Sequence, residues 1–403
     1  MKVALDTLGC KLNQAETEKL ARQFLEGGHC LVSPETSADV YILNTCTVTS
    51  NADGKARRWL RLAHRRNPGA RLVVTGCYAQ RRPDELARME GVCLVVGNNE
   101  KPHLLRLLQD AGCPVSPAAA SGYSPVLRTR TFINIQDGCS RSCTYCIVPR
   151  VRGEEKSRPA EDVIVEVKKR VDEGYREVIL TGTEIGAYYG GLSFTGLLGR
   201  ILTETSVPRL RLSSLQPQEI SSELLELWQD SRLCPHFHLS LQSGSNRILR
   251  CMRRSYSSED YERIVRVIRD MVPDAAITTD IIVGFPSETE EEFAETYDFC
   301  RKLQFARIHV FSYSSRPDTE ASRMSGQISL KVKGERSRKM LALAEQSADN
   351  FQKRFLGKVM TVLWETKLNG IWSGFTGNYI KAYTKSDDDL SNRVLAVKLD
   401  KLT

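Results

Sequence analysis

Short apolar runs alternate with amphipathic stretches over the first 112 residues of the chain. The runs are rich in aliphatic and β-branched residues, as in buried parallel strands, and the stretches between them carry apolar residues at helical spacing. The predicted strands are Lys2–Thr7, Val40–Leu43, Leu72–Thr75 and Val92–Val96, and the predicted helices are Gln14–Glu26, Ser50–Arg66 and Asp84–Met89. Because strands alternate with helices, we expect an open parallel α/β domain here.

The same alternation resumes at Thr131, after residues 113–125, which are rich in Pro, Ser, Gly and Ala and have no periodicity. Such a composition predicts a linker and a domain boundary. The predicted strands beyond it are Phe132–Gln136, Glu177–Leu180, Leu210–Ser214, Phe237–Leu241, Ile277–Val283 and Ile308–Tyr313, with helices at Ala160–Glu173, Ser258–Met271 and Glu288–Leu303. Six strand-and-helix units are fewer than a closed eight-fold barrel has, so we expect a partial (β/α)6 barrel.

The last part of the chain combines a basic helical segment, Lys331–Phe355, with short strands. The predicted strands are Val359–Trp364, Gly370–Trp372, Tyr379–Tyr383 and Arg393–Leu399. Four short strands separated by turn residues predict a small all-β barrel of the kind that binds oligonucleotides. The expected domains are therefore residues 1–122, 123–340 and 341–403.

Composition and charge narrow the classes of protein. Hydrophobic residues make up 41% of the chain and charged residues 26%, which excludes a largely disordered or collagen-like protein. No apolar run approaches the roughly 18 residues of a membrane span, and Asp6 directly follows the short apolar start of the chain, unlike in a secretory signal. We expect a reducing, cytoplasmic location without a membrane partner, where the 12 cysteines are metal ligands or buried thiols.

The net charge of +8 is unevenly distributed. Both ends of the chain are basic, and the middle, residues 131–330, is slightly acidic. A catalytic body with basic outlying surfaces favours a polyanionic partner, of which nucleic acid is the usual example.

Three cysteines, Cys139, Cys143 and Cys146, form a CxxxCxxC array directly after a predicted strand. Three thiolates this close can hold one metal centre, and a 4Fe-4S cluster held by three thiolates keeps one iron open to a small molecule. The alternative is structural zinc completed by a distant Cys or His. Zinc arrays usually contain two CxxC pairs, and this array has one, so the cluster is favoured.

A second set consists of Cys10, Cys46 and Cys77, each a few residues past the end of a predicted strand. Loops after parallel strands converge at one edge of a sheet, so these cysteines are expected to hold a second cluster with an open iron. Unconnected buried thiols are the alternative. Cys93 and Cys300 are expected to be small core residues, and the remaining four have no partner at ligand spacing, namely Cys30, Cys113, Cys234 and Cys251.

Together these features resemble the radical SAM (S-adenosylmethionine) methylthiotransferase family over essentially the whole chain. The resemblance is carried by TLGCKLNQ at Thr7–Gln14, NTCTVT at Asn44–Thr49, VTGCYAQ at Val74–Gln80 and FINIQDGC at Phe132–Cys139. Within the family the chain is most similar to the tRNA enzymes that modify N6-threonylcarbamoyladenosine (t6A). The isopentenyladenosine subgroup usually has a TYGCQMN-like first motif and the ribosomal-protein branch an LGCPKN-like one.

The resemblance implies an enzyme that converts t6A, on the 3′ side of the anticodon, to its 2-methylthio derivative. It implies two 4Fe-4S clusters, one that cleaves SAM to a 5′-deoxyadenosyl radical and one that supplies a methylated sulfur to C2. The implied partners are the tRNA anticodon stem-loop and an electron donor such as flavodoxin or ferredoxin. Methylthiolation of isopentenyladenosine tRNA or of a ribosomal protein, and a non-catalytic, metal-containing RNA-binding protein, are the alternatives.

The resemblance also suggests which side chains bind SAM, because in this family they follow the barrel strands. The expected SAM contacts are Tyr145, Thr183, Glu184, Ser214, Gln242, Arg254 and Val283. Tyr145 is expected to pack on the adenine, Glu184 to hold the methionine amino group and Arg254 to pair with the carboxylate, although an exposed arginine is the commoner case.

The expected tRNA contacts are Arg150, Arg152 and Glu154, just past the cluster loop, and Lys381 in the tail, which resembles a TRAM domain. The tail also carries rings that either stack on bases or fill its small core, namely Trp372, Phe375, Tyr379 and Tyr383.

Overall fold

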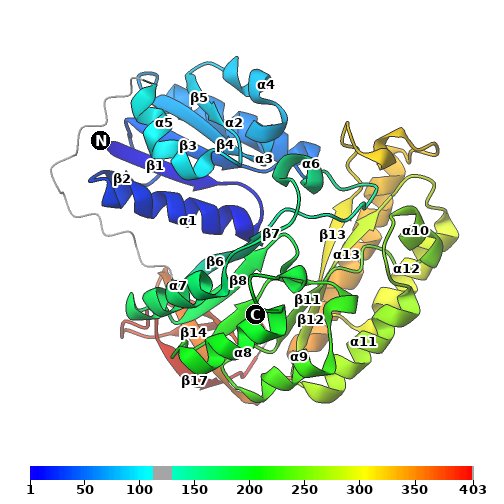
Figure 1. Cartoon of the computed structure of the whole chain (residues 1–403). Helices are drawn as coiled ribbons and strands as arrows, with labels where there is room; N and C mark the ends of the chain where they lie inside the picture. Colours follow the sequence, from blue (N-terminus) through cyan, green and yellow to red (C-terminus); the bar gives the residue numbers. More distant parts are fainter. Residues whose placement is uncertain (112–128, 402–403) are drawn as a thin grey trace.

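The computed structural model describes residues 1–111 and 129–401. Its N-terminal part is a parallel sheet between two layers of helices (Figure 1). The strands, in the order β2-β1-β3-β4-β5, are β1 (Lys2–Thr7), β2 (Cys30–Val32), β3 (Val40–Thr45), β4 (Arg71–Gly76) and β5 (Val92–Val96). The helices are α1 (Lys11–Glu26), α2 (Ser50–Arg66), α3 (Cys77–Arg81), α4 (Pro83–Ala87) and α5 (Leu104–Asp110). The predicted open parallel sheet is confirmed, with the three-residue β2 as an addition.

Both faces of this sheet are covered, which explains the continuous apolar runs. Phe24 of α1 and Leu104 of α5 pack with Ile42 on one face, and Leu60 of α2 packs with Leu43 on the other. Cys93 differs from expectation because its side chain is exposed. It lies where the pairing of β4 with β5 shifts register, and such a bulge at a sheet edge turns a residue outward.

The middle part is an open barrel of six parallel strands, as predicted. The strands are β6 (Arg130–Asp137), β8 (Glu177–Gly182), β9 with β10 (Leu210–Leu212 and Ser214–Leu215), β11 (His236–Leu239), β12 (Ala276–Val283) and β13 (Arg307–Ser312), and β7 (Lys156–Ser157) pairs antiparallel with β6. The predicted third strand is interrupted at Ser213 and joins the sheets β7-β6-β8-β9 and β10-β11-β12-β13.

Helices cover the outer face of the barrel (Figure 1). They are α7 (Ala160–Asp172), α8 (Phe194–Glu204), α9 (Ser222–Glu226), α10 (Asn246–Cys251), α11 (Ser258–Met271) and α12 (Glu290–Leu303), whereas the short α6 (Val148–Arg152) lies at the domain interface against α3. Two of them begin with a capping box: Ser257 with Asp260 at α11, and Thr289 with Glu292 at α12. These reciprocal bonds satisfy free backbone N–H groups and explain why both helices start where the sequence predicts, to within two residues.

The long helix α13 (Leu330–Lys353) belongs to the barrel in its packing, since Met340 and Leu343 are part of the barrel core. The expected domain boundary after residue 340 lies inside this helix, and the expected boundary after residue 122 lies outside the described residues. The tail forms an antiparallel half-barrel, ordered β16-β15-β14-β17, from β14 (Val359–Leu368), β15 (Ile371–Thr376), β16 (Lys381–Lys385) and β17 (Val394–Lys398). Within the described ranges, no helix is both long and apolar enough to span a membrane.

The half-barrel docks on the amino ends of the barrel strands through one turn. The ring of Tyr379 lies over the guanidinium of the buried Arg211, 3.7 Å from the ring centroid. Arg211 also donates to the carbonyl of Gly377 (2.7 Å) and pairs with buried Glu177. The turn thus closes the end of the barrel opposite the loops that follow the strands.

Two buried ion-pair networks hold the N-terminal domain against the barrel. Arg152 of α6 pairs with Asp137 and with Glu16 of α1 (both 2.9 Å), and Lys101 also pairs with Glu16. Arg316, on the loop after β13, pairs with buried Asp53 at the start of α2. These contacts place the loops after β1, β3 and β4 over the mouth of the barrel.

Candidate active site

The first cysteine triad lies on the loop between β6 and α6. Gly138 starts this loop with φ of +74°, and a Cβ there would lie 1.9 Å from the carbonyl oxygen of Glu154. The Cys139 N–H donates to the carbonyl of Gly153, and the Cys146 N–H donates to the carbonyl of Cys143. These backbone bonds fix the path of the loop that carries the three thiols.

The second triad is assembled by the sheet. Cys10, Cys46 and Cys77 follow β1, β3 and β4, which are neighbours in the sheet. Gly9 makes room for Cys46, because a Cβ on Gly9 would lie 2.6 Å from the Cys46 Cβ. Asn13, which sequence reasoning missed although it lies in the first motif, ties two of these loops together by donating to the carbonyls of Leu8 and Thr45 (2.9 and 3.0 Å).

The donors of both triads suit iron–sulfur clusters. The described cysteines form no disulfide. Burial, reinforced by neighbouring thiols, raises the pKa of Cys46 and of Cys139 to about 12 and that of Cys146 to about 11. Without metal these three thiols are therefore protonated near neutral pH, and a bound cluster takes the place of their protons. Three soft sulfur donors in each set match a 4Fe-4S cluster with one iron that no protein group holds.

The two triads face each other across the domain interface. Cys77 packs directly against Ile147 and Val151, which follow Cys146 in the chain. A cavity of about 210 Å³ opens beside them. It is lined by Val48 and Thr49 of the Cys46 loop, and by Cys146, Gln242 and Asp280 of the barrel. A small molecule in this cavity touches both domains.

Polar side chains at the strand ends surround Cys139 and Cys143. The Cys139 thiol donates to buried Glu184 (3.3 Å), which also accepts from Arg141 and from Gln216 (3.0 Å). Arg254 donates to the Cys143 sulfur (3.4 Å) and to the Gln216 amide oxygen (2.9 Å). A carboxylate and a guanidinium beside one cluster loop can hold an ammonium and a carboxylate, the two ends of an amino acid.

Sequence reasoning missed Arg141, Gln216 and Glu219 in this group. Burial, with Glu184 alongside, raises the pKa of the Glu219 carboxyl, while the guanidinium of Arg141 lies 3.4 Å away. The available signal was position, because Gln216 and Glu219 directly follow β10, at the edge where the loops of a parallel sheet converge.

Comparison with known proteins agrees with this geometry. Residues 133–300 match the Radical SAM superfamily and residues 2–97 match an uncharacterized protein family, UPF0004. The chain is 40% identical over 379 residues to the threonylcarbamoyladenosine tRNA methylthiotransferase MtaB of Aquifex aeolicus, covering 90% of this chain and 92% of that protein. It is 33% identical to a tRNA-2-methylthio-N(6)-dimethylallyladenosine synthase of Thermodesulfovibrio yellowstonii, covering 99% and 96%.

The chain belongs to the radical SAM methylthiotransferase family. The fold agrees: the radical SAM methyltransferase TsrM from Kitasatospora setae superposes with a TM-score of 0.60 at 18% identity, covering 80% of this chain and 75% of that one. The predicted family, the class of enzyme and the use of SAM and 4Fe-4S clusters are confirmed.

In this methylthiotransferase the seven predicted SAM residues fall into three groups. Tyr145 and Gln242 line the cavity between the triads, and Glu184 and Arg254 contact the cluster loop. The other three lie elsewhere. Ser214 bonds to His238 (2.7 Å), Thr183 donates to Asp137 (3.3 Å), and Val283 is buried in the core while its neighbour Ile282 lines the cavity.

Of the four predicted tRNA residues, three are exposed, including Lys381, and one is buried. Arg150 and Glu154 are exposed beside the cluster loop. Arg152 is buried, because Glu16, Asp137 and Asn13 (2.6 Å) occupy its guanidinium. Arg152 therefore belongs to the domain interface.

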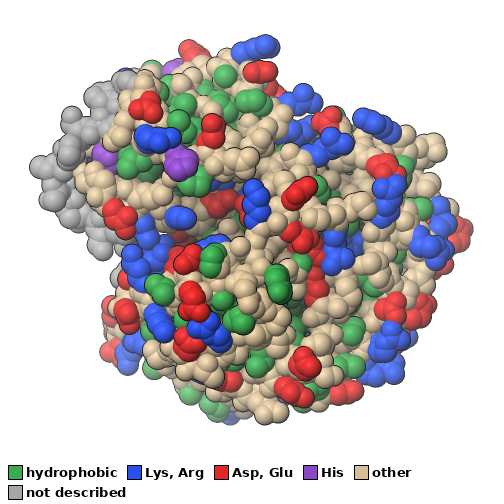
Figure 2. Space-filling model, in the orientation of Figure 1, with side chains coloured by type: hydrophobic (Ala, Val, Ile, Leu, Met, Phe, Trp, Pro, Cys, Tyr) green, Lys and Arg blue, Asp and Glu red, His purple; other side chains and the backbone are tan. Residues whose placement is uncertain are grey.

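Figure 2 shows basic and acidic side chains interspersed over the face drawn there.

The tail rings of the methylthiotransferase serve different purposes. Trp372 is in the half-barrel core, and Tyr379 covers Arg211. Tyr383 is 45% exposed, with the Lys381 ammonium 4.9 Å from its ring centroid. Among Trp372, Tyr379 and Tyr383, it is therefore Tyr383 that can stack on a base.

Proposed function

We propose that this protein converts N6-threonylcarbamoyladenosine, on the 3′ side of the tRNA anticodon, to its 2-methylthio derivative. The observation that carries the proposal is the meeting of the two cysteine triads, one from each domain, beside a single cavity. The name of the Aquifex relative supports the choice of nucleoside. The expected domains assign one triad to residues 1–122 and the other to residues 123–340, with residues 341–403 contributing to RNA binding.

The side chains have distinct tasks in this proposal. When bound, a 4Fe-4S cluster at Cys139, Cys143 and Cys146 supplies the electron that cleaves SAM. Glu184 and Arg254 hold the amino and carboxylate groups of SAM, and both are already fixed by hydrogen bonds before it binds. The Cys46 loop covers the cavity and excludes water from the reacting atoms.

The partners follow from the same arrangement. The anticodon stem-loop reaches the cavity past exposed Arg150 and Glu154, and Lys381 and Tyr383 contact the RNA from the half-barrel. A flavodoxin or ferredoxin supplies the electron from outside, and the reaction takes place in the cytoplasm. The alternatives are a dimethylallyladenosine tRNA, as in the name of the Thermodesulfovibrio relative, and a ribosomal protein.

Anaerobic reconstitution tests the proposal. The protein is assayed for iron, sulfide and SAM cleavage with stem-loops that carry t6A, dimethylallyladenosine or unmodified adenosine. We expect about eight iron and eight sulfide per chain, as for two 4Fe-4S clusters, and a methylthio product from the t6A stem-loop. A product from dimethylallyladenosine alone contradicts the proposed substrate. Zinc in place of iron and sulfide contradicts the enzyme.

A further inference from the structure

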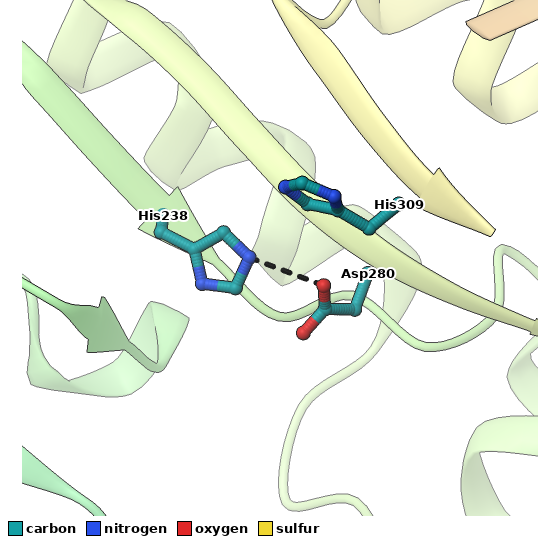
Figure 3. Close-up of side chains that lie close together, drawn as sticks. All are labelled: His238, Asp280 and His309. Carbon is teal, nitrogen blue, oxygen red and sulfur yellow. Dashed lines mark hydrogen bonds and ion pairs between the residues drawn. The ribbon is translucent and has the colours of Figure 1, made fainter. Parts of the chain in front are cut away.

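A second, larger cavity of about 940 Å³ lies between β11 to β13, α13 and the docking turn of the half-barrel. His238 and His309 line it on the barrel side, and Lys11 enters it from the N-terminal domain. Asp280 separates it from the cavity beside the triads: Asp280 lines that cavity, and its carboxylate lies 3.2 Å from His238 Nε2 (Figure 3). The two cavities therefore share a wall.

Two basic side chains, Lys11 and His309, line this cavity. Their neighbours there are aromatic: the Lys11 ammonium lies 5.9 Å from the ring centroid of Tyr379, and the His309 ring centroid lies 5.8 Å from that of His238. Within residues 1–111 and 129–401, no carboxylate lies within ion-pairing distance of the Lys11 ammonium, and no hydrogen-bond partner is found for the His309 imidazole. An ammonium that lines a cavity and has no ion-pair partner in the described part of the chain suits an anionic ligand.

His238 differs from these two groups because both of its ring nitrogens are used. One bonds to Ser214 (2.7 Å) and the other to Asp280. The nitrogen and oxygen atoms of His238, Asp280 and His309 lie within 4.8 Å of one another. Because both ring nitrogens of His238 already have partners, the side chains left to bind a ligand are His309 and Lys11. One imidazole and one ammonium suit a carboxylate rather than a metal ion.

The two candidate nucleosides differ in the charge of the group on N6, which is the property that this cavity could recognise. A threonylcarbamoyl group ends in a carboxylate, whereas a dimethylallyl group is apolar. In adenine, C2 and C6 are both bonded to N1, so the group on N6 leaves the ring beside C2. A base whose C2 lies between the triads can direct its N6 group past Asp280 toward the neighbouring cavity, which Lys11, one residue after Cys10, helps to line.

We propose that Lys11 and His309 bind the carboxylate of the N6-threonylcarbamoyl group and select this nucleoside over an uncharged one. The inference rests on the proposed function, which it deepens by naming the residues that recognise the substrate. The exposed side chains of Arg307 and Lys381 line the same cavity, where they can contact phosphates of the RNA backbone.

The test measures binding of three anticodon stem-loops to the reconstituted holoenzyme by fluorescence anisotropy. The stem-loops carry t6A, the methyl ester of its carboxylate, or unmodified adenosine. The variants are Lys11→Met and His309→Leu, and the matched control is Lys169→Met, which removes one exposed charge from α7. We expect each cavity variant to weaken binding of the t6A stem-loop about tenfold, the size of one charge-assisted contact, and to leave the other two stem-loops and the control unchanged.

The possible failures are distinguishable. If the variants weaken all three stem-loops equally, Lys11 and His309 contact phosphates, and the inference is wrong. The same holds if the variants bind every stem-loop as the unaltered protein does. If the unaltered holoenzyme makes no product from the t6A stem-loop, the proposed function fails first. Iron content is measured in every variant, and because His309 lies on β13, away from the loops that carry both triads, its variant decides the matter if Lys11→Met loses iron.

Discussion

The two cysteine triads differ in how the chain builds them. Cys139, Cys143 and Cys146 lie within eight residues on one loop, whereas Cys10, Cys46 and Cys77 lie on three loops brought together by the sheet order β1-β3-β4. The first depends on one strand and one turn. The second depends on the folding of the whole N-terminal domain. A local site and a dispersed site should therefore fail in different ways.

The largest effects on activity are expected from two separate variants, each of which removes one proposed cluster ligand from one triad. Cys143→Ala should abolish SAM cleavage, and Cys46→Ala should preserve SAM cleavage while the methylthio product is lost. Each variant should retain about four of about eight iron atoms. Iron analysis, 5′-deoxyadenosine release and product mass measure the three quantities. Loss of SAM cleavage in Cys46→Ala would show that the triads are not independent.

Glycine substitutions should break each triad through the backbone. Gly138→Ala places a Cβ 1.9 Å from a carbonyl oxygen at φ of +74°, and Gly9→Ala places one 2.6 Å from the Cys46 Cβ at φ of +122°. Both positions disfavour any side chain. We expect Gly138→Ala to lose the SAM-cleaving cluster and Gly9→Ala the other, as seen by iron content. Gly174→Ala is the control, because it has positive φ and open space.

Breaking the ion pairs between the two domains should destabilise the packing on which the dispersed triad depends. Arg152→Met leaves the partly buried carboxylate of Glu16 with Lys101 alone, at a cost of about 3 kcal/mol, the lower end for breaking a buried pair. Burial raises the pKa of Glu16, but Lys101 and Arg152 outweigh it and lower that pKa to about 2. The contact therefore stabilises the protein above the ordinary carboxyl value of 4.5, and its contribution is lost as pH falls toward about 2.

Denaturation with urea at pH 7 and at pH 3 measures this contribution. The unaltered protein should lose more stability on acidification than Arg152→Met does. An equal loss in both proteins would show that Glu16 and Arg152 are not coupled.

A smaller effect is expected at the polar group beside the local triad. Glu184→Gln removes the charge next to Cys139 and should raise the KM for SAM about tenfold, the value of one charged contact. The iron content should not change, because Glu184 is not a ligand in either triad. A changed kcat with an unaltered KM would argue against a role in holding SAM.

The smallest effect should come from the half-barrel. Tyr383→Ala removes an exposed ring and should weaken tRNA binding by about 1 kcal/mol, with SAM cleavage unchanged in the absence of RNA. Lys385→Ala on the same strand is the charge control. Equal binding by Tyr383→Ala and the unaltered protein would mean that the half-barrel does not stack on a base.

The sequence alone predicted much of this. The CxxxCxxC array, the strands of the sheet and the partial barrel followed from local spacing and from apolar periodicity, because these depend on neighbouring residues. The buried position of Arg152 did not follow, since its partner Glu16 is 136 residues away. The role of Tyr379 was equally hidden, because an aromatic residue in a turn has the same local signature whether it stacks on RNA or on Arg211.

What the sequence determined is therefore the composition of the proposed site, which is six cysteines in two sets, each set next to strand ends. Tertiary structure decided what the cysteines face, because the meeting of the triads depends on the ion pairs of Arg152 and Arg316 across the domain interface. It also decided that Lys11 reaches a cavity lined by His309, 298 residues further along the chain. Burial and charge at such a distance arise only when separate elements pack together.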